Sequence, residues 1–497
     1  MTSDSPRPGR PPMAAGPVVL VAGALAVLLL ATANGYGYHR DELYFRLLGQ
    51  RPEWGYVDQP PATPLLARLT TELFGDHLWA LRLPGALVAA ATAILTALLA
   101  RELGAGRAGQ LLAALGAATA FPLVFGHVLL TATLDMVVGA AVLLSVARAL
   151  LRDERWWLAV GALVGVGLYN KHLIVLALAA VGVALVLVGP RRTLASRWLW
   201  IGVAIALAVG APNLVYQATH GWPQLAMAEA IERNKGAESR ALFVPMQLVL
   251  LGPLLAPVWI AGLVRLLRDP ALRPARALGV AYPILCVLVL VSGGQPYYTL
   301  ALVLALYAAG CAPTVRWLAG RRPRVALLGG ALAINAIVSG LIALPLLPVP
   351  ALARTPIPAA NQATSDQVGW PRYVAQIAEV YHGLPPADRD RAVIVTANYG
   401  EAGALDRYGD RHDLPAVYSG HNELYHRGAP PETASVVVAV GFRAGPALEA
   451  AFGSCVVVRD LDNGVDIPNE EQELNVRVCR DPRGPWSQLW PRFQHYD

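Results

Sequence analysis

Lysine is nearly absent from this sequence, which contains 38 arginines but only two lysines, Lys171 and Lys235. Charged residues are scarce as well, at 15% of 497 residues, whereas soluble domains average about 25%. Hydrophobic residues make up 55% of the chain. This composition excludes an ordinary soluble domain and indicates a polytopic membrane protein.

Cysteine occurs only four times, which excludes a disulfide-dense scaffold and any metal site built from CxxC pairs. Cys455 and Cys479 lie outside the apolar runs and bracket the polar stretch DLDNGVDIPNEEQELNV. We expect them to form a disulfide. Two buried free thiols remain the alternative, because cysteine also packs well as a small hydrophobic residue.

Apolar runs that can cross a membrane, about 20 residues each, dominate the first two thirds of the chain. There are eleven, near 15–34, 77–100, 108–126, 131–150, 156–171, 173–189, 198–218, 242–264, 277–294, 297–315 and 325–347. The expected fold is an α-helical polytopic membrane protein with about 11 transmembrane helices in residues 1–347. Residues 348–497 form a separate domain.

Arginines cluster in every second loop between these runs, which predicts the orientation of the chain. The segments 127–134 and 293–297, at two of the other loops, contain no lysine or arginine. We therefore expect a multi-pass protein of the cytoplasmic membrane with a cytoplasmic N-terminus and an extracytoplasmic C-terminal domain. The net charge of +6 does not imply nucleic acid, because the arginines follow the loops and so face membrane lipids.

The first outer loop, residues 35–76, is rich in acids, bases and aromatic residues. Its segments ELYFRLLG and PPATPLLARLTTELF predict two short helices that lie flat on the membrane. In the first helix the residues able to face lipid are Leu43, Phe45, Leu47 and Leu48. Such helices would hold Asp41 and Asp58 near the headgroups, where we expect the chemistry. An ordinary solvated loop is the alternative.

Further polar residues occur at the other outer ends of the runs. They are Asp135, Lys171, His172, Arg240, Gln295, Tyr297 and Tyr298. The compact ammonium of Lys171, in a short turn, suits a phosphate ligand. Asp135 could instead cap a helix, and the two tyrosines could belong to an interfacial aromatic belt.

The tail after Pro358 has the pattern of a small α/β domain. DRAVIVTANYGEAGALDRYG predicts a strand, a turn and a helix, ASVVVAVG and CVVVRDL predict further strands, and AGPALEAAF predicts a helix. The turn with Gly400 and Gly403 offers backbone N–H groups that could hold an anion.

Five segments together resemble a known family. They are YHRDELYF, GYVDQPPATPLL, TATLD, GLYNKHLIVL and GGQPYYTLALVLALY. In this order they resemble glycosyltransferase family 39 of the C superfamily, the protein O-mannosyltransferase group, whose bacterial branch includes the aminoarabinose transferase of lipid A. The resemblance implies a polyprenyl-phosphate-linked sugar as donor and a hydroxyl acceptor outside the cytoplasmic membrane.

The resemblance also implies roles for single residues. Asp41 matches the catalytic base of the first loop, and Glu42 completes an acidic pair of which only one can face the cavity, since neighbours on a helix point about 100° apart. Lys171 matches the basic residue of its turn. Asp58 precedes Gln59, where related enzymes carry lysine, and this departure leaves a divalent metal at Asp58 undecided.

The chemistry of such a transfer fits these residue types. Cations stabilise the leaving phosphate, with Lys171 helped by Arg40 or Arg240, while a carboxylate deprotonates the acceptor from the opposite face of the sugar. The anomeric carbon would then invert. The sugar would be a mannose-like hexose or a modified pentose, and the acceptor a protein, lipid or glycan.

Two other classes compete with a transferase. A transporter or flippase of lipid-linked sugars would show inverted repeats and charged residues at mid-span, and neither is found in the sequence. An anchoring protein whose tail does the binding is the third class.

Overall fold

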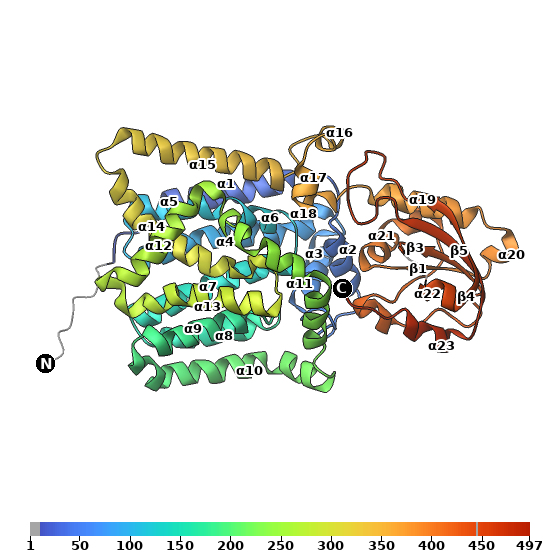
Figure 1. Ribbon diagram of the computed structural model, residues 1–497, viewed down its shortest axis with the longest axis horizontal. Helices are drawn as coiled ribbons and strands as arrows, with labels where there is room; N and C mark the ends of the chain where they lie inside the picture. Colours follow the sequence, from blue (N-terminus) through green and yellow to red (C-terminus); the bar gives the residue numbers. More distant parts are fainter. Residues whose placement is uncertain (1–9, 444–445) are drawn as a thin grey trace. The chain divides into compact units, whose positions relative to one another are not determined.

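The computed structural model describes residues 10–443 and 446–497, and its contacts divide the chain into two units (Figure 1). The first, here called the helical unit, comprises Met1–Ala33, Gln59–Thr63 and Arg82–Leu344. The second, here called the sheet unit, comprises Asn34–Asp58, Pro64–Leu81 and Pro345–Asp497. The expected domain boundary after residue 347 lies close to Leu344, but most of the first loop is grouped with the C-terminal region.

The helical unit contains long apolar helices and short connections (Figure 1). Its helices are α1 (Ala15–Thr32), α4 (Leu78–Glu102, which begins in the sheet unit), α5 (Arg107–Ala117), α6 (Phe121–His127), α7 (Thr131–Leu151), α8 (Trp156–Gly167), α9 (Leu173–Val188), α10 (Arg197–Thr219), α11 (Pro223–Val249), α12 (Ala256–Arg268), α13 (Arg276–Ser292), α14 (Leu300–Leu318) and α15 (Arg322–Ala343).

The eleven apolar runs are all largely helical, but they differ in their capacity to span a membrane. Within the described residues, seven helices are long and apolar enough to cross, or up to nine if the bent pairs α5–α6 and α11–α12 each count as one span. The runs expected at 156–171 and 173–189 form α8 and α9, which are shorter at 12 and 16 residues. The polar segment AEAIERNKGAESR, which lies between the runs 198–218 and 242–264, is helical and belongs to α11.

Reciprocal glycines bring two helix pairs of this unit close together. A Cβ on Gly262 of α12 would lie 1.8 Å from the Leu306 carbonyl oxygen, and one on Gly310 of α14 would lie 1.8 Å from the Val258 oxygen. Gly161 and Gly202 allow a similarly close approach between α8 and α10. Small residues at helix interfaces allow this close backbone approach in membrane proteins.

The sheet unit is built around a five-stranded sheet with the order β2-β1-β3-β5-β4 (Figure 1). Its strands are β1 (Ala392–Thr396), β2 (Val417–Ser419), β3 (Val436–Val440), β4 (Phe452–Asp460) and β5 (Asn475–Pro482). β1 pairs in parallel with β2 and β3, and β5 pairs antiparallel with β3 and β4. The small α/β domain expected from the sequence is therefore present.

Helices cover both faces of this sheet. Figure 1 shows α19 (Trp370–His382) and α21 (Tyr399–Tyr408) on one side, with α22 (Pro446–Ala451) and α23 (Trp486–Leu489) on the other. All five residues of β1 and of β3 are buried, as expected for strands covered on both faces. The remaining helices are α2 (Arg40–Gly49), α3 (Ala62–Phe74, which begins in the helical unit), α16 (Val349–Leu352), α17 (Ile357–Ala360), α18 (Gln362–Ser365) and α20 (Pro386–Arg389).

A disulfide joins Cys455 to Cys479, which are directly paired residues of β4 and β5. β4 is the edge strand of the sheet, and it exposes Val456, Val457 and Val458. The covalent bond therefore fixes an edge strand whose own side chains are largely outside the core.

The two short helices of the first loop are present, but the lipid-facing role expected for α2 is wrong. Leu43, Phe45, Leu47 and Leu48 are all buried within the sheet unit, where α2 packs against α21. Helix α3 instead exposes a stripe of apolar side chains four residues apart: Leu65, Leu69 and Leu73. The pattern of α2 predicted an apolar face correctly, but a protein helix covers that face.

Candidate functional site

Asp41 lies in the first turn of α2, where the helix start is fixed by its neighbours. His39 is the N-cap residue, and its Nδ1 accepts a hydrogen bond from the Asp41 backbone N–H at 3.1 Å. Glu42 is fully buried, and its Oε2 accepts from the His39 N–H at 2.8 Å. This is the capping-box arrangement, which satisfies backbone N–H groups at the helix start. The two adjacent acids therefore differ: Glu42 caps the helix, and Asp41 is half-buried.

The side chain of Asp41 is held by a residue from the far end of the chain. The Tyr399 hydroxyl donates a hydrogen bond of 2.8 Å to Asp41 Oδ1, across 358 residues of sequence. Burial comes first among the causes that raise the pKa of Tyr399, and the Asp41 charge adds to it. The phenol therefore stays protonated and remains a donor.

Tyr399 itself is part of a stack of four rings. Its ring lies 4.5 Å from that of Tyr44 and 4.9 Å from that of His421, and His421 stacks in turn on His495 at 4.6 Å. The Arg40 guanidinium lies 4.8 Å from the centre of the Tyr399 ring. The plane of Tyr399 is consequently fixed by packing on both faces.

Arg40, expected as a second phosphate ligand, is buried and forms an ion pair with Glu470 of the sheet unit. Buried cations are normally matched by such acids, because an unpaired buried charge is costly. Arg40 thus joins the first loop to the C-terminal region, and its charge is already compensated.

Asp58 belongs to a second group of acids in the sheet unit. Burial, followed by the charge of Glu423 and a smaller effect of Asp41, raises the pKa of Asp58 to about 7. Glu423 Oε2 accepts from the Val57 N–H at 2.9 Å, and the Glu423 N–H donates to the Tyr44 hydroxyl at 3.3 Å. Asp58 is therefore an acid close to its midpoint at neutral pH, unlike an ordinary surface aspartate.

Several backbone N–H groups around the start of α21, where the sequence suggested an anion site, are used within the protein. Glu401 Oε2 accepts from the N–H groups of Ala397 and Asn398, Asn398 Oδ1 accepts from the Glu401 N–H, and the Tyr399 N–H donates to His421 Nδ1. Those backbone donors are occupied. A Cβ on Gly403 would lie 2.8 Å from Leu43, so the glycine serves close packing of α21 on α2.

The helical unit contains a second group, centred on Lys171 in the turn between α8 and α9. The ammonium lies 4.7 Å from the ring centre of Tyr298 and 5.6 Å from that of Tyr297, and it interacts with the Asp135 carboxylate. Four of the sequence-predicted residues, from three separate segments, are thus brought together. A cation over aromatic faces gains electrostatic stabilisation from the rings.

Hydrogen bonds fix the turn that carries Lys171. The Ala62 N–H donates to the Tyr169 carbonyl at 2.8 Å, and the Thr63 hydroxyl donates to Asn170 Oδ1 at 2.9 Å. Asn170 Nδ2 in turn donates to the Thr131 carbonyl at 2.9 Å. The segment after Asp58 and the start of α7, which carries Asp135, are therefore both attached to the Lys171 turn.

Three other predicted residues take part in local contacts. His172 Nε2 is 2.9 Å from Asn213 Oδ1. Arg240 pairs with Glu232 at 2.8 Å and donates to the Leu290 carbonyl at the end of α13, so its charge is used within the helical unit. Gln295 precedes the 3-10 turn Pro296–Thr299, which carries both tyrosines.

Sequence reasoning missed Tyr399, Tyr44 and Glu423 as parts of the site. Tyr399 follows an Asn that starts a capping box in the segment NYGE, which predicts a helix start and no contact with the first loop. Such contacts between distant segments depend on the fold.

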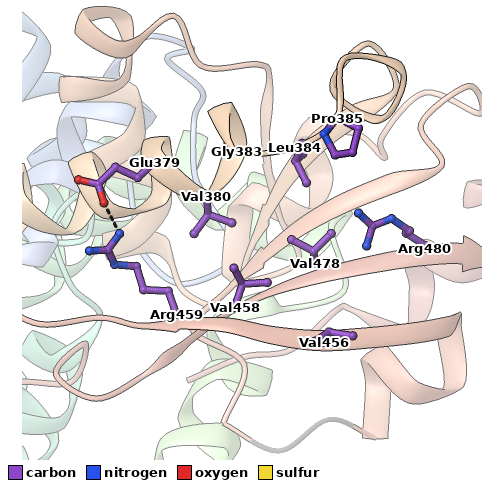
Figure 2. A pocket seen from close by; sticks show the side chains of 10 residues that line it. All are labelled: Glu379, Val380, Gly383, Leu384, Pro385, Val456, Val458, Arg459, Val478 and Arg480. Atoms are coloured by element: carbon purple, nitrogen blue, oxygen red, sulfur yellow. Dashed lines mark hydrogen bonds and ion pairs between the residues drawn. The ribbon is translucent and has the colours of Figure 1, made fainter.

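In the described part of the chain, neither a group of possible metal ligands nor the cavity of the sheet unit coincides with these residues. In the described part of the chain no group of three or more His, Cys, Asp or Glu side chains could hold a metal ion. A cavity of about 520 Å³ lies between α19, the turn after it and the β4–β5 pair, bordered by the Glu379–Arg459 ion pair (Figure 2). It is lined by none of the predicted site residues.

The model of one known family matches part of the chain. Residues 58–216 match the model of the dolichyl-phosphate-mannose-protein mannosyltransferases. This segment contains Asp58, Asp135 and Lys171, but not Asp41. A comparison with curated protein sequences found no match.

Solved structures are similar over nearly the whole chain. ArnT from Cupriavidus metallidurans bound to undecaprenyl phosphate has a TM-score of 0.60 at 18% identity, covering 93% of this chain and 97% of that one. Its apo state gives 0.58 at 17%, covering 93% and 98%. The Archaeoglobus fulgidus oligosaccharyltransferase in complex with Zn and sulfate gives 0.50 at 13%, covering 85% and 68%. The chain therefore has the fold of these structures, and the family match over residues 58–216 confirms the resemblance seen in the sequence.

Proposed function

Given a chain with the C-superfamily glycosyltransferase fold, we propose that this protein transfers a sugar from a polyprenyl-phosphate carrier to a hydroxyl acceptor. The reaction takes place on the outer side of the cytoplasmic membrane and inverts the anomeric carbon. The donor sugar is a mannose-like hexose or a modified pentose, and the acceptor is a protein, lipid or glycan.

The observation that carries this proposal is the placement of Lys171. A polyprenyl-phosphate donor presents an anionic phosphate near the membrane surface, and an ammonium is a natural ligand for it. Asp135, Tyr297 and Tyr298 hold Lys171 in the helical unit. The match of ArnT bound to undecaprenyl phosphate supports a lipid phosphate of this class.

The acids of the sheet unit supply the proton acceptor. Asp41 takes the proton from the acceptor hydroxyl as the glycosyl bond forms, while the sugar–phosphate bond breaks and the phosphate leaves with its electron pair. Glu42 acts by holding the start of α2, since its carboxylate is engaged at the His39 N–H. Asp58 is the alternative base, because its pKa of about 7 suits proton transfer near neutral pH.

The orientation of the chain is part of the same proposal. A cytoplasmic N-terminus with an extracytoplasmic C-terminal region follows from the arginine pattern. The Cys455–Cys479 disulfide supports it, because disulfides persist in oxidising compartments and are rare in the cytosol.

The test compares the cell envelopes of strains with and without the protein by mass spectrometry of glycans, glycoproteins and lipids. We expect one sugar modification to disappear on deletion and to return with the wild-type gene, while Asp41→Asn fails to restore it. A deletion strain whose envelope is unchanged, and in which no polyprenyl-phosphate sugar accumulates, would contradict the proposal.

A further inference from the structure

We propose that Tyr399 is a positioning residue for the proposed sugar transfer, which holds the Asp41 carboxylate in the orientation that accepts the proton. The inference rests on the proposed function with Asp41 as base. It gives the C-terminal region a direct part in the reaction.

The geometry directs the tyrosine at one oxygen of the carboxylate. The Tyr399 hydroxyl donates to Asp41 Oδ1 at 2.8 Å, which is the usual length of an O–H···O hydrogen bond. Among the described residues, no hydrogen bond occupies Asp41 Oδ2. One oxygen is therefore held by the phenol while the other is left for the acceptor hydroxyl.

Ring packing and a backbone hydrogen bond hold Tyr399 in place. Its ring lies between Tyr44 and His421, and its backbone N–H donates to His421 Nδ1. Next to it, a Cβ on Gly400 would lie 3.0 Å from the Arg40 Cβ, so α21 sits directly against the start of α2. A side chain locked in this way can hold a catalytic group within the narrow range that efficient catalysis needs.

The hydrogen bond acts on the orientation of the base. It selects one orientation of the carboxylate, so that less ordering is needed when the acceptor binds. Loss of the hydroxyl should therefore slow the transfer without weakening donor binding.

The experiment compares wild type with Tyr399→Phe, which keeps the stacked ring and removes only the hydroxyl. Release of undecaprenyl phosphate is measured from undecaprenyl-phosphate-linked mannose and undecaprenyl-phosphate-linked aminoarabinose, with acceptor membranes from a strain lacking the protein. We expect kcat to fall by about 10- to 100-fold, from the worth of a hydrogen bond to a charged group, with the donor KM unchanged.

Tyr408→Phe is the matched control, since Tyr408 lies at the other end of the same helix and is also half-buried. It should keep the wild-type kcat and the wild-type donor KM. Wild-type kinetics in Tyr399→Phe, beside an inactive Asp41→Asn, would overturn the role of Tyr399 and leave the transferase intact. Absence of transfer by the wild type with both donors would contradict the proposed function itself. A rise in donor KM at constant kcat would also overturn positioning of the base.

Discussion

The two units hold their candidate groups in opposite ways. In the helical unit, Lys171 lies near the rings of Tyr297 and Tyr298 and interacts with the Asp135 carboxylate. In the sheet unit, Asp41 lies in a dense network of acids, tyrosines and histidines drawn from both ends of the sequence. A single cation in an apolar setting is suited to binding one anion, whereas a coupled network is suited to controlling a proton.

The proposed function uses this difference, with donor binding by Lys171 and proton transfer by Asp41. Substitutions in the sheet unit should therefore change the rate, and substitutions around Lys171 should change donor affinity. A substitution in the sheet unit that changes only donor affinity, or one around Lys171 that changes only the rate, would contradict this comparison.

The largest expected effect is that of Asp41→Asn, which keeps the shape of the side chain but cannot take up the proton. Loss of a general base typically lowers the rate by about 10²- to 10⁴-fold. Donor binding should be retained, because Lys171 is untouched. Transfer kinetics and binding of undecaprenyl phosphate to the purified protein measure the two effects separately.

Glu42→Gln and Asp58→Asn are the companions of that variant. Glu42→Gln keeps an acceptor for the His39 N–H and should remain active. If Asp41→Asn transfers sugar at the wild-type rate while Asp58→Asn is inactive, Asp58 is the base. If all three variants stay active, the proposed mechanism fails.

Lys171→Ala comes next and tests the other unit. Removing one charged contact to phosphate should weaken binding of undecaprenyl phosphate by about 10- to 100-fold. Lys171→Arg should restore binding only in part, because the guanidinium is planar and longer. The matched control is Lys235→Ala, the other lysine of the chain, in α11. Equal affinity of the Lys171→Ala and wild-type proteins would reduce Lys171 to a structural cation.

The smallest effect concerns stability and sharpens the description of the sheet unit. The pKa of Asp58 is about 7 in the fold and near 4 in an unfolded chain. Between these values the folded state holds a proton that the unfolded state has lost, so stability falls as pH rises from about 4 to 7. Asp58→Asn removes this loss. Its melting temperature should exceed that of wild type at pH 8 by more than at pH 5.

Asp76→Asn provides a control of opposite sign. Burial opposes ionisation of Asp76, but its hydrogen bonds and ion pair with Arg46 prevail and lower its pKa. The stabilisation is present above the unfolded pKa, so this variant should melt below wild type at pH 8. Parallel shifts of the two variants with pH would show that the assigned environments are wrong.

Local patterns predicted much of the fold but little of the network around Asp41. Apolar runs, the helices of the first loop and the strands of the tail all follow from periodicity. The group around Lys171 was also predictable, because Asp135, Tyr297 and Tyr298 all lie at ends of apolar runs that are expected on the outer side of the membrane. The covering of Leu43 and Phe45 was not, since an apolar face on α2 does not say whether lipid or protein buries it. Neither was the contact of Tyr399 with Asp41, which local propensity cannot encode.

The disulfide between β4 and β5 has a consequence for how the protein is made. Under the proposed orientation, a chain inserted the wrong way round would keep Cys455 and Cys479 as thiols in the cytosol, where disulfides rarely persist. Its edge strand, with three exposed valines, would then be held by ladder hydrogen bonds alone and would be open to pairing with other chains. Correct insertion and correct folding of the sheet are coupled in this way. The presence of the disulfide therefore reports on which side of the membrane the sheet folded.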